Sequence, residues 1–173
     1  MPYLHKVYGV MNFMKIRWKT LIIAVLIPLI TGSAAALISR NAMKNFENIN
    51  QPPLSPPMWL FPVAWTVLYI LMGIASYLVF TSHNTSYKDM SEKRSALAFY
   101  ALQLFFNFVW TLIFFNLEQY FFSFVWLVVL WVLIIITMVK FFKIDRKSGF
   151  LMLPYLLWVT FAGYLNFGVF LLN

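Results

Sequence analysis

The strongest constraint on this chain is the recurrence of long, continuously apolar segments. Five runs of at least eighteen predominantly apolar residues follow one another, at 21–38, 58–80, 96–115, 121–142 and 150–172. A helix needs about 20 residues to cross the hydrocarbon core of a bilayer, so each run has the length of a membrane span. The runs lack the two-residue alternation of transmembrane β-strands. The sequence therefore predicts an all-α membrane protein, a five-transmembrane-helix bundle.

Composition supports this fold class and leaves little room for a second domain. Only 10% of the residues are charged and 62% are apolar, whereas a soluble domain is about 25% charged. We divide the chain into a basic N-terminal extension at 1–19 and a transmembrane domain at 20–173. A signal peptide, with 33–36 as the small residues of its cleavage site, is the alternative for the first run. As a retained helix, Gly32 and Ala36 would form a small-xxx-small pair that lets another helix approach closely.

The net charge of +8 is distributed unevenly along the predicted topology. Eleven of the 13 basic residues fall on one side of a five-helix bundle, and only Arg40 and Lys44 fall on the other. The eleven are Lys6, Lys15, Arg17, Lys19, Lys88, Lys93, Arg94, Lys140, Lys143, Arg146 and Lys147. Basic residues collect on the cytoplasmic side of membranes. We therefore expect a bacterial cytoplasmic membrane protein with a cytoplasmic N-terminus, and no nucleic-acid partner.

The connections between the runs differ in character. Segment 39–57 is predicted to be a loop, polar at first and then rich in proline. Within it, Ser55 precedes two prolines, a pattern typical of a helix start, so the second helix is expected to begin there. Segment 81–95 is predicted to be a solvated connection. Segment 116–120 is so short that the third and fourth helices must be antiparallel neighbours.

Several kinds of chemistry have no visible components in this sequence. There is no cysteine, which excludes disulfides, thiolate metal sites and thiol nucleophiles. Apart from helix ends such as Lys140, the spans hold no ionisable residue, and His5 and His83 lie in water-facing segments. Ion-coupled transport usually needs intramembrane charges, and a catalytic serine needs a base. The residues therefore predict no metal site, no required cofactor and no covalent catalysis.

The spans do contain uncharged polar and aromatic side chains at helical spacing. The three stripes are Trp65, Tyr69, Met72, Gly73 and Ser76; Gln103, Asn107, Trp110 and Thr111; and Trp158, Ala162, Leu165 and Asn166. Amide and indole groups in hydrocarbon need hydrogen-bond partners, so the stripes are expected to face one another. Taken singly, each residue fits a role in holding helices together equally well. Taken together, they suit a cavity for a flat, mostly apolar ligand.

Three segments resemble one known family. Segment 52–79, PPLSPPMWLFPVAWTVLYILMGIASYLV, resembles the first-loop and second-helix signature of the TspO/MBR family of translocator proteins, peripheral-type benzodiazepine receptors and tryptophan-rich sensory proteins. Segments 103–115, QLFFNFVWTLIFF, and 153–173, LPYLLWVTFAGYLNFGVFLLN, are similar to the family's third and fifth helices. The resemblance implies a five-helix bundle, usually a homodimer, with a pocket covered by the first loop.

The resemblance also implies a function. Family members bind tetrapyrroles such as protoporphyrin and haem, some drug-like isoquinolines and benzodiazepines, and in some animals cholesterol. The matching ligand-binding positions here are Trp65, Tyr69, Asn107, Trp110, Trp158 and Ala162. The implied role is a membrane receptor or sensor. A light-dependent porphyrin-degrading enzyme and a carrier of a hydrophobic metabolite remain alternatives.

Two departures from the family pattern modify these expectations. The family commonly has Trp-x-Pro-Pro in the first loop, whereas this chain has Leu-Ser-Pro-Pro at 54–57, so an aromatic ring that could stack on a ligand is absent. We expect weaker tetrapyrrole binding as a result. The family's sterol-recognition stretch ends in an aromatic residue and an arginine, whereas Phe170 is followed here by Leu-Leu-Asn. Cholesterol is therefore not an expected ligand.

Overall fold

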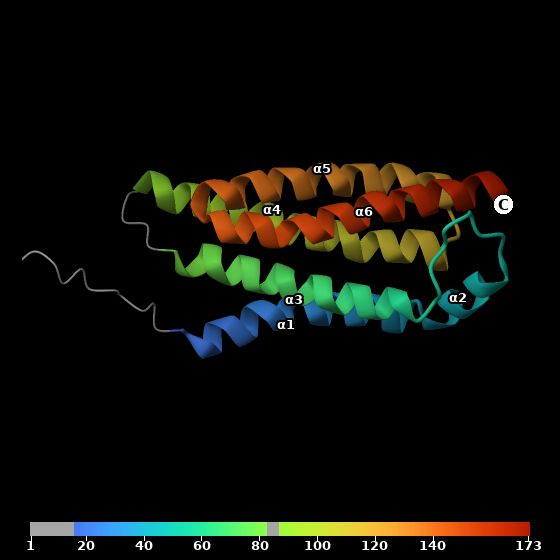
Figure 1. The fold of residues 1–173 in the computed structure, drawn as a ribbon, viewed down its shortest axis with the longest axis horizontal. Coiled ribbons are helices and arrows are strands. Elements are labelled where there is room, and N and C mark those ends of the chain that lie inside the picture. The colour runs from blue at the N-terminus through green and yellow to red at the C-terminus, as the bar shows by residue number, and fades with distance from the viewer. Residues whose placement is uncertain (1–15, 83–86) are drawn as a thin grey trace, which may run out of the picture.

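The five predicted spans form five long helices lying side by side. The computed structural model describes residues 16–82 and 87–173. Its long helices are α1 (Trp18–Ile38), α3 (Leu60–Thr81), α4 (Tyr87–Thr111), α5 (Tyr120–Ile144) and α6 (Arg146–Leu172). Each is long and apolar enough to cross a membrane. The prediction of an all-α, five-helix membrane bundle is confirmed (Figure 1).

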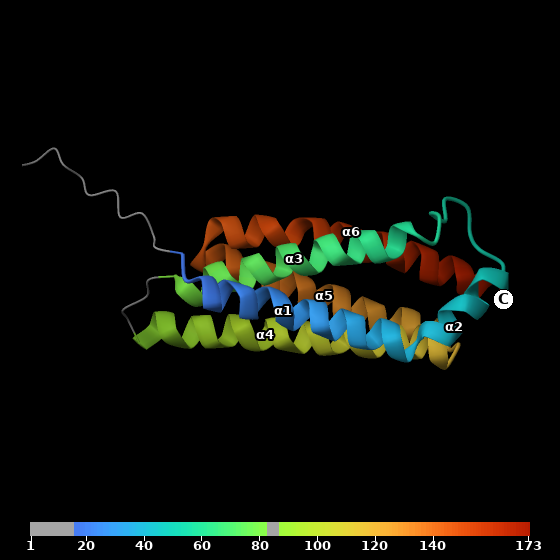
Figure 2. The same ribbon diagram turned by 90° about the horizontal axis from the view of Figure 1, so that it is seen from below.

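Three shorter elements lie at one end of the bundle. The first loop contains α2 (Arg40–Asn45) and the 3₁₀ turn η1 (Phe46–Asn48). A π-helical turn, η2 (Leu112–Asn116), continues α4. In both views α2 and the loop after it lie at the same end as the C-terminus (Figures 1 and 2). The first loop is thus placed to cover this end of the bundle.

Close approach of α1 and α3 depends on two glycines. A Cβ atom added to Gly73 would lie 2.5 Å from the Cα atom of Val25, so the two helix backbones leave no room for a side chain. A Cβ on Gly32 would overlap the ring of Tyr69. Small residues permit such packing in membrane bundles. The close helix approach expected at Gly32 is therefore made within this chain, between α1 and α3.

Short connections make α4, α5 and α6 successive neighbours. α4 and α5 pack along their lengths, as the short segment between them predicted, and α5 and α6 pack more extensively still. Only Asp145 separates α5 from α6. Its carboxylate accepts a hydrogen bond from the backbone amide of Ser148 (2.8 Å), which caps the first turn of α6.

The predicted start of the second span at Ser55 is wrong. α3 begins at Leu60, and the Ser55 hydroxyl donates instead to the Pro52 carbonyl (2.8 Å). The backbone amide of Ser55 approaches the same carbonyl (3.3 Å), which closes a turn with Leu54 at a φ of 66°. Serine serves turns as readily as helix caps, so the sequence pattern alone did not distinguish them.

Other predicted loops were too long. The segment 81–95 is mostly helical because α4 begins at Tyr87, and the segment 39–57 opens with α2. Charged residues such as lysine and arginine are good helix formers, so a helix continues past the end of its apolar run. Lys93 shows the consequence, since its ammonium donates to the carbonyls of Phe80 (3.1 Å) and Ser82 (2.8 Å) at the C-terminal end of α3.

The described basic residues gather at the end of the bundle opposite to α2. Arg17 and Lys19 lie at the start of α1, and another group lies where α5 meets α6. Arg40 and Lys44 lie in or beside α2 at the other end. The cytoplasmic location of the first end stays a prediction. Most of the predicted extension at 1–19, together with His5 and His83, falls outside the described residues.

We predict that Gly73→Ala destabilises the bundle by about 1–3 kcal/mol, because the new methyl group would force the α1 and α3 backbones apart. Gly163→Ala is the matched control in α6. Its Cβ would lie 3.3 Å from a flexible Leu127 methyl group, and the gain in helix propensity offsets the crowding. Thermal unfolding in detergent measures both. Equal losses in the two variants would contradict this account of the packing.

Candidate ligand pocket

A cavity of about 360 Å³ lies between the helices at the end covered by the first loop. Residues of α1, α2, α3, α6, the first loop and the α4–η2 segment line it. Its size falls within the roughly 300–1,000 Å³ typical of small-molecule pockets. Most of the lining side chains are aromatic or aliphatic.

The structure brings the predicted site residues together at this cavity. Five of them line it: Trp65, Tyr69, Trp110, Trp158 and Ala162. Asn107 does not line the cavity and lies behind Tyr69, with only 1% of its surface exposed. Asn107 can therefore influence a ligand through the position of Tyr69.

Other lining residues were missed by the sequence reasoning. Most of them come from the first loop, the start of α3 and the π-helical turn η2, and three come from α1 and α6: Met43, Lys44, Phe46, Gln51, Pro52, Ser55, Met58, Phe61, Pro62, Phe114, Phe115, Gly32, Ala36 and Val169. Phe61 lies four residues before Trp65 and so continues the α3 stripe, which was a usable signal. The loop residues follow no helical period, so spacing could not single them out, although the family resemblance implied that the first loop covers the pocket.

The aromatic walls are packed against one another. The rings of Trp65 and Tyr69 stack with centroids 5.4 Å apart and an interplanar angle of 30°. Phe61 meets Trp158 edge to face at 6.1 Å. Offset stacks and edge-to-face pairs are the favoured geometries of aromatic rings. The cavity is thus bounded by rings that support each other.

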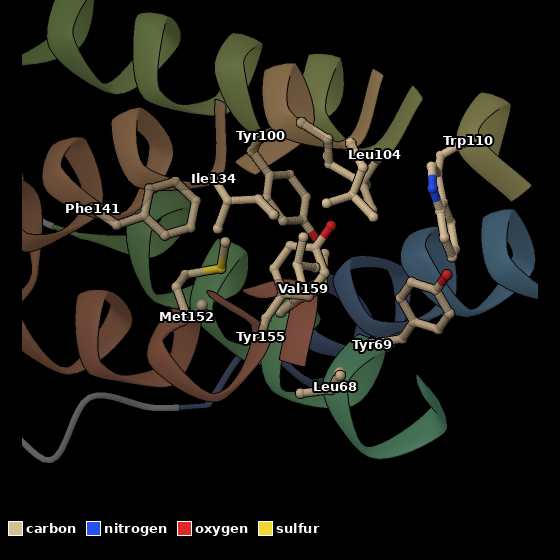
Figure 3. Close-up of a cluster of buried hydrophobic side chains, with 14 of the residues drawn as sticks. Leu68, Tyr69, Tyr100, Leu104, Trp110, Ile134, Phe141, Met152, Tyr155 and Val159 are labelled. Atoms are coloured by element: carbon tan, nitrogen blue, oxygen red, sulfur yellow. The ribbon is translucent and has the colours of Figure 1, made fainter. Parts of the chain in front are cut away.

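A buried chain of hydrogen bonds fixes the Tyr69 ring. Its hydroxyl donates to the side-chain oxygen of Asn107 (2.8 Å), whose amide nitrogen donates to the Tyr155 hydroxyl (3.3 Å). Tyr155 donates in turn to the Gln103 side-chain oxygen (2.9 Å). Figure 3 shows Tyr69 and Trp110 at one end of the buried cluster, with Tyr155 further along it. This chain links α3, α4 and α6 beneath the cavity.

A second polar group fixes the Trp110 indole. Its N–H donates to the side-chain oxygen of Asn166 (3.1 Å), which also accepts from the Ser123 hydroxyl (3.1 Å). The Asn166 amide nitrogen donates to the Tyr120 carbonyl (2.8 Å). Asn166 thereby joins α4, α5 and α6, and the Trp110 indole has no hydrogen to spare for a ligand.

Trp158 differs in this respect from the three tryptophans whose indole groups are paired within the protein. The indole N–H groups of Trp110, Trp126 and Trp131 each donate to an oxygen atom within the protein. The Trp158 nitrogen is buried and meets no acceptor among the described residues. Leaving a buried donor unpaired costs about 1–3 kcal/mol. A ligand oxygen or nitrogen that reached Trp158 would remove this cost.

The first loop is fastened to the end of α6. The backbone amide of Asn50 donates to the side-chain oxygen of Asn173 (3.1 Å), and the Asn173 amide nitrogen donates back to the Asn50 carbonyl (3.0 Å). The Tyr164 hydroxyl donates to the Pro53 carbonyl (2.9 Å). Beside them, the Leu54 side chain is 80% exposed and does not line the cavity. Weaker tetrapyrrole binding at this position stays a prediction.

Within residues 16–82 and 87–173, no group of three or more His, Cys, Asp or Glu side chains is arranged to hold a metal ion. The described lining of the pocket offers aromatic faces, aliphatic contacts and a few hydrogen-bond donors. Such a site can hold a flat, hydrophobic molecule and fix its orientation.

These features define a class of protein: a polytopic membrane protein with a preformed aromatic pocket beneath the first loop. Sequence comparison then gives the family. The TspO/MBR family profile matches residues 24–172, and the chain belongs to this family.

Named relatives span bacteria, archaea and animals. The chain is 40% identical over 128 residues to a tryptophan-rich sensory protein of Cereibacter sphaeroides, covering 74% of this chain and 76% of the relative. It is 34% identical over 164 residues to a tryptophan-rich protein TspO of Archaeoglobus fulgidus, covering 94% and 99%. It is 28% identical over 143 residues to the translocator protein of Bos taurus, covering 82% and 83%.

We predict that Asn166→Leu lowers the free energy of unfolding by about 1–3 kcal/mol, because the Trp110 N–H would remain buried without an acceptor. Ser123→Ala removes only one of the bonds to Asn166 and is the matched control, with an expected loss below about 1 kcal/mol. Thermal or denaturant unfolding in detergent compares the two. A larger loss for Ser123→Ala would show that Asn166 is not the central residue of this group.

Proposed function

We propose that this protein is a membrane receptor or sensor that binds a tetrapyrrole such as protoporphyrin or haem in the pocket between its helices. The observation that carries the proposal is a cavity walled by aromatic rings and lined by Trp158, whose buried indole N–H has no acceptor among the described residues. Membership of the TspO/MBR family supports the receptor or sensor role, and one relative is named a tryptophan-rich sensory protein.

Complementarity of shape and chemistry supports a tetrapyrrole. The macrocycle is flat and aromatic, and the stacked rings of Trp65 and Tyr69 offer it a matching face. Ring nitrogens and peripheral oxygens are acceptors for the Trp158 N–H. Because Tyr69 and Trp110 are held by Asn107 and Asn166, little conformational freedom is lost when the pocket is filled.

The membrane placement of the protein follows from the same observations. Five spanning helices imply a lipid bilayer environment. We infer that the basic end of the bundle faces the cytoplasm, in a bacterial cytoplasmic membrane, since basic residues are retained on that side. The pocket and its covering loop would then lie toward the external face. A homodimer is the assembly that we expect in the membrane.

Titration of the purified protein with protoporphyrin in the dark tests the proposal. We predict saturable, micromolar quenching of tryptophan fluorescence, accompanied by a shift of the porphyrin absorption band. Trp158→Phe keeps an aromatic ring and removes the N–H, so binding should weaken about 3- to 10-fold. The absorption band gives an affinity that does not depend on the number of tryptophans.

Trp131→Phe is the matched control for this titration. Its indole donates to the Thr160 hydroxyl (2.8 Å), and it does not line the cavity. The control should bind protoporphyrin as the native chain does. Linear quenching that is unchanged in Trp158→Phe would mean that the porphyrin does not occupy this pocket.

A further inference from the structure

One side chain on the cavity wall differs in kind from all the others. Among the described residues that line the cavity, Lys44 alone carries a charge. It belongs to the last turn of α2 and is exposed to solvent. A residue that is exposed and also lines the cavity lies where the cavity opens to water. The pocket therefore has a cation at its mouth and an apolar interior.

The neutral polar residues of the lining are already engaged within the protein. The Ser55 hydroxyl donates to the Pro52 carbonyl (2.8 Å), and the Thr111 hydroxyl donates to the Asn107 carbonyl (3.2 Å). The Gln51 amide nitrogen donates to the Phe46 carbonyl (3.5 Å). These residues are poorly placed to decide which polar ligand enters.

The donors that remain to recognise a ligand are the indole N–H groups of Trp65 and Trp158 and the ammonium group of Lys44. The Trp158 N–H lies among the aromatic walls, and the Lys44 ammonium lies at the mouth. An ammonium group forms its strongest hydrogen bonds with carboxylate or phosphate oxygens. Among the described residues of the lining, none carries a carboxylate that would compete for Lys44 or repel an anion. This arrangement suits an elongated or flat apolar body that ends in an anionic group.

We propose that the pocket selects hydrophobic ligands that carry a carboxylate, with Lys44 holding the carboxylate at the mouth. The inference rests on the proposed function, because it takes a tetrapyrrole as the apolar body. A porphyrin with propionate side chains provides both the flat apolar body and the carboxylate. A neutral porphyrin provides only the apolar body. Lys44 is a specificity-determining residue in this arrangement.

The test compares protoporphyrin, which has two carboxylates, with its dimethyl ester, which has none. Binding of each is measured by absorption titration in a neutral detergent at low salt. The native chain should prefer the acid about fivefold, the size expected of an ion pair at an exposed site. Raising the salt concentration to about 0.5 M should reduce this preference, because exposed charges are then screened over a few ångströms.

Lys44→Met keeps most of the length of the side chain and removes the charge. It should lose the preference for the acid while binding the ester as the native chain does, and retained ester binding shows that the variant is folded. Arg40→Met is the matched control. Arg40 lies in the same short helix and carries the same charge, but it does not line the cavity. Its variant should keep the preference.

The outcomes separate this inference from the proposed function. If acid and ester both bind saturably with equal affinity, the role of Lys44 is overturned and the tetrapyrrole pocket stands. If Arg40→Met loses the preference as fully as Lys44→Met, the effect is the general charge of this end of the protein, and the assignment to Lys44 is wrong. If neither compound binds saturably, both proposals fail together.

Because the phosphate of an anionic lipid could also pair with Lys44, the titration is repeated in nanodiscs of phosphatidylcholine with and without phosphatidylglycerol. Competition for Lys44 by the lipid headgroup would lower the native chain's preference for protoporphyrin in the anionic discs and leave Lys44→Met unaffected. An unchanged preference assigns the site to the soluble ligand alone.

Discussion

The hydrocarbon core of a bilayer supplies no water to hydrogen-bond a buried polar group, and the arrangement of this bundle follows from that constraint. Asn107 joins α3 to α6 through two tyrosines, and Asn166 joins α4 to both α5 and α6. Each amide satisfies several neighbours at once, so neither can be removed without leaving another group unpaired. The same bonds hold Tyr69 and Trp110 in place. The hydrogen bonds that join the helices therefore also determine the shape of the pocket.

Most polar groups of the pocket are already hydrogen-bonded within the protein. The few unpaired groups therefore determine which ligand is recognised. The indole of Trp158 and the ammonium of Lys44 are both donors, and most of the residues that line the cavity with them are aromatic or aliphatic. The loop that carries Lys44 toward the cavity is held at its other end by Asn173. Packing within the membrane thus provides the apolar part of the site, and the first loop provides its charge.

The fold and the inner part of the pocket could be predicted from the sequence. Trp65, Tyr69 and Trp158 could be assigned to one cavity because helical periodicity places them on common faces and polar groups in lipid must face inward. Helical periodicity shows which face of a helix a residue lies on, but it does not show how far that residue lies from the cavity. The position of Asn107 behind Tyr69 was therefore not foreseen. The loop contribution of Lys44 depends on tertiary contacts, which no local pattern encodes. Helix ends were misjudged where charged residues prolonged a helix beyond its apolar run.

The π-helical turn at the end of α4 makes the geometry of the pocket depend on the number of residues in this turn. The amide of Leu117 donates to the carbonyl of Leu112 (3.1 Å), five residues earlier, so this turn holds one residue more than an α-helical turn. The extra residue lets the adjacent Phe114 and Phe115 both border the cavity and both contact Phe46 of the covering loop, with ring centroids 5.3 Å apart in each case. Deleting a single residue here would restore α-helical geometry and rotate the adjoining side chains by about 100° around the helix axis. A one-residue insertion or deletion among relatives could therefore remodel the ligand site while every membrane span kept its length.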